Sequence, residues 1–527
     1  MAHAQVPEIY SISPPAARAG EVVRIIGDQF ATEPANNTVH IGASKARVLR
    51  SWVSELEVEV PPSLQAGPVT VSVGNKLAIS STPFLPLFAP FGATNPVYAQ
   101  RVKFSGGFNP AAVDLDNDGD LELIVAKSEH LEVYRYVGTE PLLSENSFAL
   151  VQSVTGFVGT ASIREMDMDA NGKFDLLVTS SNGVVRIARN WYQSGEPGKD
   201  LLAVYTAPTP QSRVSEFFDV NLDGTPDLIS WDGSNVYYYR GISSFGGGHG
   251  THASGQRIAP IDGRLVTGMA VGDLNLDGHV DVATLDGQKI TIHSHNSRSS
   301  DVGTDWARFT LSATNLTGLQ IADLQGDGQM DLIAFNRATR YCEAYWNRNH
   351  GGHLAAEDFE HVVLSPPEIS STILPRLIDL DGDALPELIF RSRSYHHNES
   401  ALLGDLIFGG TFLPFTNAWN VSFTSTAGLL SADLNRDGQP EIITSDGTIY
   451  QNLSAVAPVI IASEQWRSGS MQISVAGYPN QTVSLRSTTD FISWTNAGSI
   501  RVGESGVAKL DMAATTPMRF YVIAPEP

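Results

Sequence analysis

The chain has 527 residues, of which 42% are hydrophobic, and it carries a formal net charge of −23. Its length predicts roughly two to four domains, and it contains no run of about 18 apolar residues that could span a membrane. The acidic balance argues against nucleic acid or an anionic membrane surface as the main partner.

The first residues, MAHAQVPEIY, lack the apolar stretch of a signal peptide. Ala2, His3 and Ala4 nevertheless have the A-x-A form that precedes a signal-cleavage site. We therefore expect a secreted or cell-surface protein whose export signal has been removed. Cys342 is its one cysteine, which excludes an intrachain disulfide, and its apolar neighbours predict a buried small side chain rather than a nucleophile.

Residues 6–88 consist of short alternating patterns separated by proline and glycine turns, which predicts a β-rich domain. Four motifs mark this segment: P-x-I at Pro7, S-P at Ser13, G-x-x-F at Gly27, and a proline-to-glycine spacing that begins at Pro62. On these motifs it resembles an IPT/TIG domain, an immunoglobulin-like β-sandwich. That fold serves many functions, so the resemblance names no ligand.

An aspartate-rich pattern then recurs seven times, with successive copies starting 50 to 56 residues apart. The copies are DLDNDGDLEL from Asp114, DMDANGKFDL from Asp167, DVNLDGTPDL from Asp219, DLNLDGHVDV from Asp273, DLQGDGQMDL from Asp323, DLDGDALPEL from Asp379 and DLNRDGQPEI from Asp433. We call them aspartate loops one to seven and number their positions from the first aspartate. Such regular recurrence indicates one repeated structural unit.

The residue types in these loops predict a calcium site. Oxygen-bearing side chains at positions 1, 3 and 5 of a tight loop converge on one point, and an acid at position 9 closes the shell. An all-oxygen shell suits Ca²⁺, whereas Mg²⁺ demands stricter octahedral geometry. The alternative is that the loops are merely Asp-Gly turns, which the acid at position 9 in all seven copies disfavours.

The loops differ from an EF-hand, which needs a glutamate at position 12 and flanking helices. Position 12 is never a ligand type here, and a short apolar run follows position 9, as in Leu123–Val125. Each loop therefore joins two strands. Further strand patterns follow, such as LEVYRYV from Leu131, so that each period predicts four strands, which is typical of a β-propeller blade.

On these features residues 89–455 resemble the FG-GAP/VCBS repeats of integrin α-chain propellers and of many secreted bacterial proteins. The resemblance implies a seven-bladed propeller with up to seven Ca²⁺ ions. The side chains that match the metal positions are Asp114, Asp116, Asp118 and Glu122; Asp167, Asp169, Asn171 and Asp175; Asp219, Asn221, Asp223 and Asp227; Asp273, Asn275, Asp277 and Asp281; Asp323, Gln325, Asp327 and Asp331; Asp379, Asp381, Asp383 and Glu387; and Asp433, Asn435, Asp437 and Glu441. Two loops depart from the pattern, because Gln325 is longer than the usual side chain and Ala384 replaces the glycine.

The end of the repeat region predicts how the ring closes. After the seventh loop only two strands follow, PEIIT and GTIYQNL. Residues 97–104, upstream of the first loop, match the outer strand that precedes the second loop in length and glycine placement. We therefore expect them to complete blade seven, which would pair both ends of the ring in one sheet and hide two open edges. Residues 456–527 are rich in strands without aspartate loops and predict a small C-terminal β module.

Other candidate sites carry weaker signals. The chain has no G-x-S-x-G, H-E-x-x-H or phosphate-binding motif. Histidine pairs occur at His249 and His252, His293 and His295, and His350 and His353, which are expected to be exposed polar loops rather than a transition-metal or sugar site. Among the aromatic residues, Trp231 sits beside a turn and is expected to be the most exposed.

Two functions from different classes remain. The favoured one is an adhesion or binding module for an extracellular protein or polysaccharide. The alternative is a calcium-dependent polysaccharide lyase or hydrolase, which would need a base and a charge-neutralising group in one cleft. No such set is evident in the sequence, so non-enzymatic binding is favoured, and a polysaccharide cleavage screen would separate the two.

Overall fold

In the residues that it describes, the computed structural model contains strands and three short 3₁₀ helices, in agreement with the predicted all-β class. It describes residues 6–88, 98–106, 108–138, 143–191, 202–206, 214–242, 251–252, 255–259, 264–295, 306–325, 327–349, 351–364, 376–378, 387–393, 399–404, 418–422, 429–452, 460–467, 470–476, 482–488, 495–501, 507–513 and 520–525. The chain divides into two compact units, Met1–Phe88 with Ala99–Gln451, and Ala89–Tyr98 with Asn452–Pro527. Within the described ranges, no helix is both long and apolar enough to cross a membrane.

The N-terminal segment forms the expected immunoglobulin-like sandwich, with strands paired in the order β1-β3-β6-β5-β4-β7-β8-β2. Its elements are β1 (Glu8–Ser13), β2 (Ala16–Ala17), β3 (Val22–Asp28), the 3₁₀ helix η1 (Pro34–Asn36), β4 (Thr38–Ile41), β5 (Ser44–Trp52), β6 (Glu55–Glu59), β7 (Gly67–Val73) and β8 (Lys76–Pro86). Alternate residues such as Val23 and Ile25 point into the core. The G-x-x-F motif has a steric cause, because a Cβ at Gly27 would collide with the Glu8 carbonyl oxygen and the Phe30 ring.

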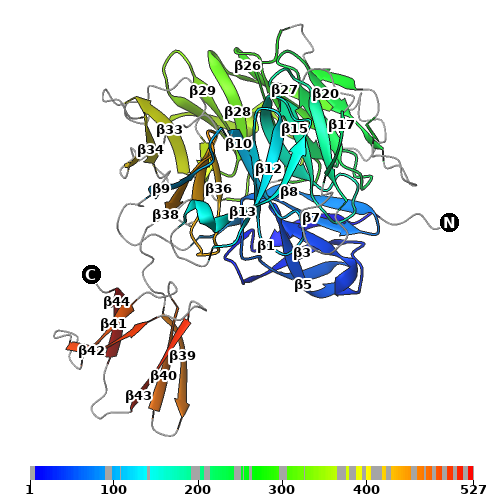
Figure 1. Cartoon of the computed structure of the whole chain (residues 1–527). Helices are drawn as coiled ribbons and strands as arrows, with labels where there is room; N and C mark the ends of the chain where they lie inside the picture. Colours follow the sequence, from blue (N-terminus) through cyan, green and yellow to red (C-terminus); the bar gives the residue numbers. More distant parts are fainter. Residues whose placement is uncertain are drawn as a thin grey trace. The chain divides into compact units, whose positions relative to one another are not determined.

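Seven four-stranded antiparallel sheets follow, arranged as the blades of a propeller (Figure 1). Blades one to three are β10 (Phe108–Val113), β11 (Glu122–Ala126), β12 (His130–Tyr136) and β13 (Phe148–Thr155); β14 (Thr160–Met166), β15 (Asp175–Ser180), β16 (Val185–Asn190) and β17 (Leu202–Thr206); and β18 (Val214–Phe218), β19 (Asp227–Trp231), β20 (Val236–Tyr239) and β23 (Gln256–Ala259). Blades four and five are β24 (Gly268–Gly272), β25 (Asp281–Leu285), β26 (Lys289–His295) and β27 (Trp306–Ser312); and β28 (Leu316–Ala322), β29 (Asp331–Asn336), β30 (Cys342–Asn347) and β31 (Phe359–Leu364). Blades six and seven are β32 (Arg376–Ile378), β33 (Glu387–Arg393), β34 (Glu399–Gly404) and β35 (Ala418–Ser422); and β36 (Leu429–Ala432), β37 (Glu441–Thr444), β38 (Thr448–Asn452) and β9 (Tyr98–Lys103).

Smaller elements decorate the blades. They are a two-stranded ribbon, β21 (Gly241–Ile242) with β22 (Thr251–His252), and the 3₁₀ helices η2 (Glu145–Ser147) and η3 (Ala356–Asp358). The second strand of each blade is the apolar run predicted after position 9, and β11, β25 and β29 are buried along their whole length. Cys342 is buried in the same core, as predicted.

The ring closes through a shared blade, which confirms the expectation for residues 97–104. Strand β9 is hydrogen-bonded to β38 at the outer edge of blade seven, although it precedes blade one in the chain. The Phe104 amide donates to the Gly447 carbonyl over 3.0 Å, and Lys103 Nζ lies 3.2 Å from Asp446 Oδ2. The N-terminal and C-terminal strands of the ring therefore hold each other in one sheet.

The second compact unit, taken by itself, contains two three-stranded sheets. One consists of β39 (Ile460–Arg467), β40 (Ser470–Ala476) and β43 (Val507–Ala513), and the other of β41 (Thr482–Thr488), β42 (Thr495–Arg501) and β44 (Phe520–Pro525). Its composition of strands agrees with the small β module expected at this end of the chain.

Closure through β9 predicts that Val102→Asp destabilises the propeller. Val102 is buried in the hydrophobic cluster shared by blades seven, one and two. An unpaired carboxylate there should lower the free energy of unfolding by about 3 kcal/mol or more. Gln100→Asp adds the same charge at an exposed position of the same strand and serves as control. Equal denaturation curves for the two variants would contradict a sealing role for β9.

Candidate metal loops

Each described aspartate loop connects the first strand of its blade to the second. Loop one begins directly after Val113, the last residue of β10, and ends at Glu122, the first residue of β11. Val113 and Glu122 are register partners in the antiparallel pair. The same pairing brings position 9 beside the residue that precedes position 1 in loops two, three, four, five and seven. Antiparallel pairing therefore brings the acids at positions 1 and 9 to one end of the sheet. We call this end of the propeller the loop end, and the other the turn end.

The acid at position 9 makes the same hydrogen bond in all six described loops: one of its oxygens accepts from the backbone amide of position 2. The amide–oxygen pairs are Leu115–Glu122 at 2.9 Å, Met168–Asp175 at 3.1 Å, Val220–Asp227 at 3.0 Å, Leu274–Asp281 at 2.9 Å, Leu324–Asp331 at 3.1 Å and Leu434–Glu441 at 2.9 Å. The repeated contact fixes the orientation of this carboxylate and explains why the position is acidic in every copy.

The aspartate at position 1 organises the turn itself. In loop one, Asp114 Oδ1 accepts from the Asp118 amide over 3.1 Å and Oδ2 from the Gly119 amide over 2.9 Å. Position 6 has a φ of +93° in loop one, which explains its glycine. Position 4 is also left-handed, with Ala170 at +55° and Leu222 at +53°. Side chains tolerate this region only when their surroundings impose it, which is typical of ligand-binding loops.

Burial makes the charged form of these acids unfavourable. Desolvation raises the pKa of Asp114 to about 6, and that of Asp167 and Asp227 to about 7. It also raises the pKa of Asp219 well above its usual value, with the charges of Asp227 and Asp223 adding to the effect. Pairs of buried carboxylates of this kind are stable when a cation replaces the lost water.

Several buried oxygens of the loops have no hydrogen-bond donor, so they could serve as ligands of a hard cation. In loop four these atoms are Asn275 Oδ1 and Asp281 Oδ1, and comparable oxygens occur on Asp169 in loop two and Glu441 in loop seven. In loop one, Asp114, Asp116 and Glu122 each offer a carboxylate oxygen within 4.8 Å of the others. Buried oxygens without a donor, and carboxylate oxygens that converge as in loop one, are of the chemical type that Ca²⁺ prefers.

Arginines from the third strand of four blades face the loops from outside. Arg135 pairs with Asp116 and lies 3.3 Å from Glu122, while Arg189 pairs with Asp169. Arg240 and Arg348 do the same in blades three and five, where Arg240 Nη2 is 2.8 Å from Asp223 Oδ2 and Arg348 Nη1 is 3.0 Å from Gln325 Oε1. The aspartate pattern does not include these arginines, although Arg135, Arg189 and Arg240 recur 21 or 22 residues after the first aspartate of their loops.

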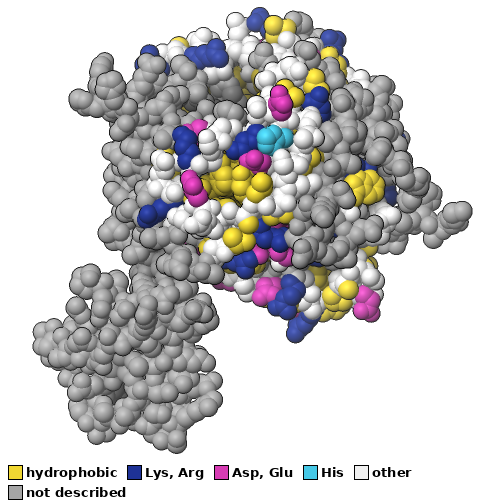
Figure 2. Space-filling view, in the orientation of Figure 1, with side chains coloured by type: hydrophobic (Ala, Val, Ile, Leu, Met, Phe, Trp, Pro, Cys, Tyr) yellow, Lys and Arg dark blue, Asp and Glu magenta, His cyan; other side chains and the backbone are white. Residues whose placement is uncertain are grey.

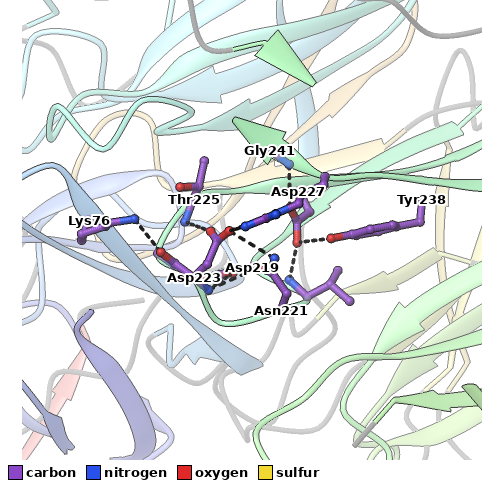
Figure 3. A network of polar contacts seen from close by, with 11 residues as sticks. Lys76, Asp219, Asn221, Asp223, Thr225, Asp227, Tyr238 and Gly241 are labelled. Atoms are coloured by element: carbon purple, nitrogen blue, oxygen red, sulfur yellow. Dashed lines mark hydrogen bonds and ion pairs between the residues drawn. The ribbon is translucent and has the colours of Figure 1, made fainter. Parts of the chain in front are cut away.

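The N-terminal sandwich lies against the loop end and hydrogen-bonds to the loops. The Lys45 amide donates to Asp114 Oδ2 over 3.0 Å, and Ser72 Oγ donates to Asp167 Oδ2 over 2.7 Å. Figure 3 shows loop three, where Lys76 Nζ reaches the Asp223 carbonyl at 2.6 Å. The same view shows Tyr238 and Gly241 donating to Asp227, at 3.2 and 2.6 Å.

The contacts extend to two more loops. Ser81 hydrogen-bonds to Asp273 in loop four, and the Asp433 amide of loop seven donates to the Leu64 carbonyl over 3.1 Å. Hydrophobic packing accompanies them, since Leu77 of the sandwich is fully buried in a cluster with Met166 and Phe217 of blades two and three. The loop end is thus a docking platform for the sandwich.

In loop one the structure brings Asp114, Asp116 and Glu122 together. In loops two to five and seven it brings the acids at positions 1 and 9 to the same end of the strand pair, and the role of all these residues in binding metal stays a prediction. Asp379, Asp381 and Asp383 of loop six lie outside the described residues, and Glu387 is described only as the backbone start of β33. Loop five keeps the standard contacts of the Leu324 and Gly328 amides although its position 3 is Gln325, whose Oε1 accepts from Arg348 Nη1.

Two expectations about other residues were wrong. His293 and His295 are buried rather than exposed, at 1% and 0% relative exposure, because their strand β26 lies inside blade four. Trp231 is only half-exposed, because its ring packs against the cluster of blades three and four and its Nε1 donates to the Val266 carbonyl. His249 and His350 lie outside the described residues, as does the side chain of His252.

Comparison with known protein families matches residues 7–86 to the IPT/TIG domain. Residues 114–178, 219–284 and 273–334 match the FG-GAP-like repeat. Both matches agree with the resemblances identified from the sequence motifs. No curated protein sequence matches the chain.

Among solved structures, an auxiliary nutrient binding protein from Bacteroides thetaiotaomicron VPI-5482 is 10% identical, with a TM-score of 0.29 over 85% of this chain and 98% of that chain. A lectin of Agrocybe aegerita, described as recognising non-reducing terminal N-acetylglucosamine, is 16% identical, with a TM-score of 0.40 over 69% of this chain and 92% of that chain. Likeness at this level says nothing about the ligand of this chain.

Protein stripped of metal should lose stability as the pH rises. Burial raises the pKa of Asp167, Asp227 and Asp331 from 3.8 to about 7. Between about pH 4 and 7 the folded state therefore holds protons that the unfolded chain has lost. The stabilisation from these protons is complete below about pH 4 and is lost as the pH passes 7. Melting temperatures of metal-free protein at pH 5 and 7.5 measure this, and a higher value at pH 7.5 would refute it.

Proposed function

Because the chain carries an IPT/TIG domain followed by FG-GAP-like repeats, we propose that it is a secreted, calcium-binding scaffold that binds an extracellular protein or polysaccharide. The observation that supports calcium most strongly is the common geometry of six loops, in which buried carboxylates are oriented by backbone amides and some oxygens lack any donor. Asp114, Asp116 and Glu122 would hold the ion in loop one, and their counterparts would do so elsewhere. The ion would neutralise acids that burial otherwise leaves uncompensated.

The arrangement favours binding over catalysis. A lyase or hydrolase needs a base or a carboxylate pair that is open to the substrate. The acids at positions 1 and 9 of the described loops are instead committed to backbone amides, and Asp114 and Asp167 also bond to the docked sandwich. Their arrangement suits a structural metal site rather than a reacting one.

The turn end of the propeller is the face that we propose for the partner, because the sandwich occupies the loop end. Connections between second and third strands and between blades meet at the turn end, and loops held by a rigid scaffold are common binding sites. Exposed hydrophobic side chains occur there, namely Val158, Leu265 and Tyr341.

Calcium should raise the melting temperature of the metal-free protein. At about 1 mM Ca²⁺ and dissociation constants of about 10⁻⁴ to 10⁻³ M, each site would add about 0.4–1.4 kcal/mol to the free energy of unfolding. Asp227→Asn, at the start of β19, should lower the bound calcium by about one ion per chain as counted by mass spectrometry. Asp232→Asn, just beyond the other end of β19, is the matched control. Equal metal counts and an unchanged melting temperature would rule out calcium in loop three.

The binding role is tested with immobilised neutral and acidic polysaccharides and extracellular proteins in the presence of Ca²⁺. We expect saturable binding without a change in polysaccharide chain length, because the proposed face carries no described catalytic set. Chelation should weaken binding, since the scaffold would lose its metal. Shortened polysaccharide or unsaturated products in the same samples would favour the lyase or hydrolase instead.

A further inference from the structure

A pocket of about 340 Å³ opens between the outer strand of blade three and the sheet of blade four. Its position is at the turn end, away from the aspartate loops and the docked sandwich. Arg264 comes from the connection between the blades, Lys289 from β26 and Arg308 from β27. The volume lies in the range of about 300–1,000 Å³ that is usual for small-ligand sites.

The lining of this pocket has the opposite charge to the chain as a whole. The net charge of the chain is −23, yet Arg264, Lys289 and Arg308 all line the pocket. The one acid among the lining residues, Asp286, caps the turn between β25 and β26, with Oδ1 accepting from the Gln288 and Lys289 amides at 2.9 Å each. Basic side chains are likewise interspersed with acidic ones on the face drawn in Figure 2, so overall acidity does not prevent local anion sites.

A buried histidine holds Arg308 in place. Arg308 Nε donates to His293 Nδ1 over 3.2 Å, so the ring proton resides on Nε2. Nε2 can then donate to Thr284 Oγ1 at 3.1 Å, whose hydroxyl donates to the Thr291 carbonyl at 3.3 Å. Burial, with a smaller contribution from Arg308, lowers the pKa of His293 to about 3, so the ring is a neutral acceptor at physiological pH.

This chain of hydrogen bonds uses only the Nε of Arg308. Among the described residues no carboxylate forms an ion pair with Arg308, although the side chain lines the pocket. Within the described part of the chain, its two terminal nitrogens therefore remain for a ligand. A guanidinium whose Nε is fixed by a hydrogen bond is suited to bidentate recognition of a planar or tetrahedral oxyanion through its terminal nitrogens.

The rim that carries Arg264 is also preformed. Trp231 Nε1 donates to the Val266 carbonyl over 3.1 Å, and the Val266 amide donates to the Ser234 carbonyl over 3.0 Å. These hydrogen bonds hold the connection between blades three and four against the turn between β19 and β20. A site whose walls are already fixed loses little conformational entropy on binding.

Polar groups beside the cations match a saccharide. The hydroxyl of Thr310, at an exposed position, lines the same pocket, and so does its register partner Thr291. Hydroxyl groups of this kind can pair with sugar hydroxyls. We infer that this pocket binds the carboxylate or sulfate group of an acidic saccharide, with Arg308 as its principal contact and His293 as a positioning residue. The inference rests on the proposed binding function and names the ligand class.

The test titrates glucuronate, glucose 6-sulfate and glucose into the calcium-loaded full chain, with calorimetry or NMR as readout. We expect one or both acids to bind, glucose not to bind, and Arg308→Gln to weaken the acid at least tenfold. Arg337→Gln, an exposed arginine in the turn between β29 and β30, should leave the affinity unchanged. The acid that binds more tightly identifies carboxylate or sulfate as the source.

A second pair of variants tests the role of His293. His293→Gln keeps an acceptor for Arg308 and should retain affinity better than His293→Leu, with circular dichroism confirming that both fold. If the two variants bind equally well, His293 does not position Arg308. Acid binding that is insensitive to Arg308→Gln, equal binding of glucose, or tighter binding of a polyglutamate peptide would overturn the inference.

These outcomes separate the pocket from the broader proposal. Polysaccharide binding that survives Arg308→Gln would refute the pocket and leave the proposed function standing. Binding of the small acids through Arg308, with no polysaccharide or protein bound in the panel, would support the pocket and refute the proposed function.

Discussion

At the loop end of the six blades whose loops are described, the carboxylates at positions 1 and 9 meet across the start of an antiparallel strand pair, and all of them except Asp323 are buried. Each has exchanged water for backbone amides, and amide hydrogen bonds alone do not compensate a buried charge. Arginines from the third strands and polar groups of the N-terminal sandwich offset part of this cost. Other oxygens of the loops remain available for a cation. The strand ends, the turns and the docking of the sandwich are all arranged around the same acids.

The loop end and the turn end of the propeller therefore have different roles. Ser72 and Lys45 contact the position 1 acids of loops two and one, so metal chemistry and domain docking share the same atoms. The turn end is not constrained in this way, and its turns can vary without disturbing the acids. A pocket such as the one around Arg308 can therefore arise there while the loops at the other end keep their pattern.

The repeated parts of this organisation could be predicted from the sequence. The aspartate pattern located the six loops that the structure describes, and the missing fourth strand of blade seven predicted the role of β9, because both follow from counting repeated units. Contacts that depend on the three-dimensional path of one segment could not be predicted in this way. Ser72 and Asp167 are 95 residues apart, and no pattern in either segment indicates their hydrogen bond. His293 looked like an exposed loop histidine because its burial depends on the sheet around it.

The seam in blade seven also determines how the ring would respond to a pulling force. Residue 98 begins β9 and residue 452 ends β38, and the contact between Phe104 and Gly447 shows that the two strands run antiparallel. Tension applied between these two points acts on the same end of the pair. It loads the hydrogen bonds one after another, as in a zipper, rather than together in shear. Tension applied at residues 98 and 452 would therefore separate β9 from β38 one hydrogen bond at a time, and the ring would open at blade seven first.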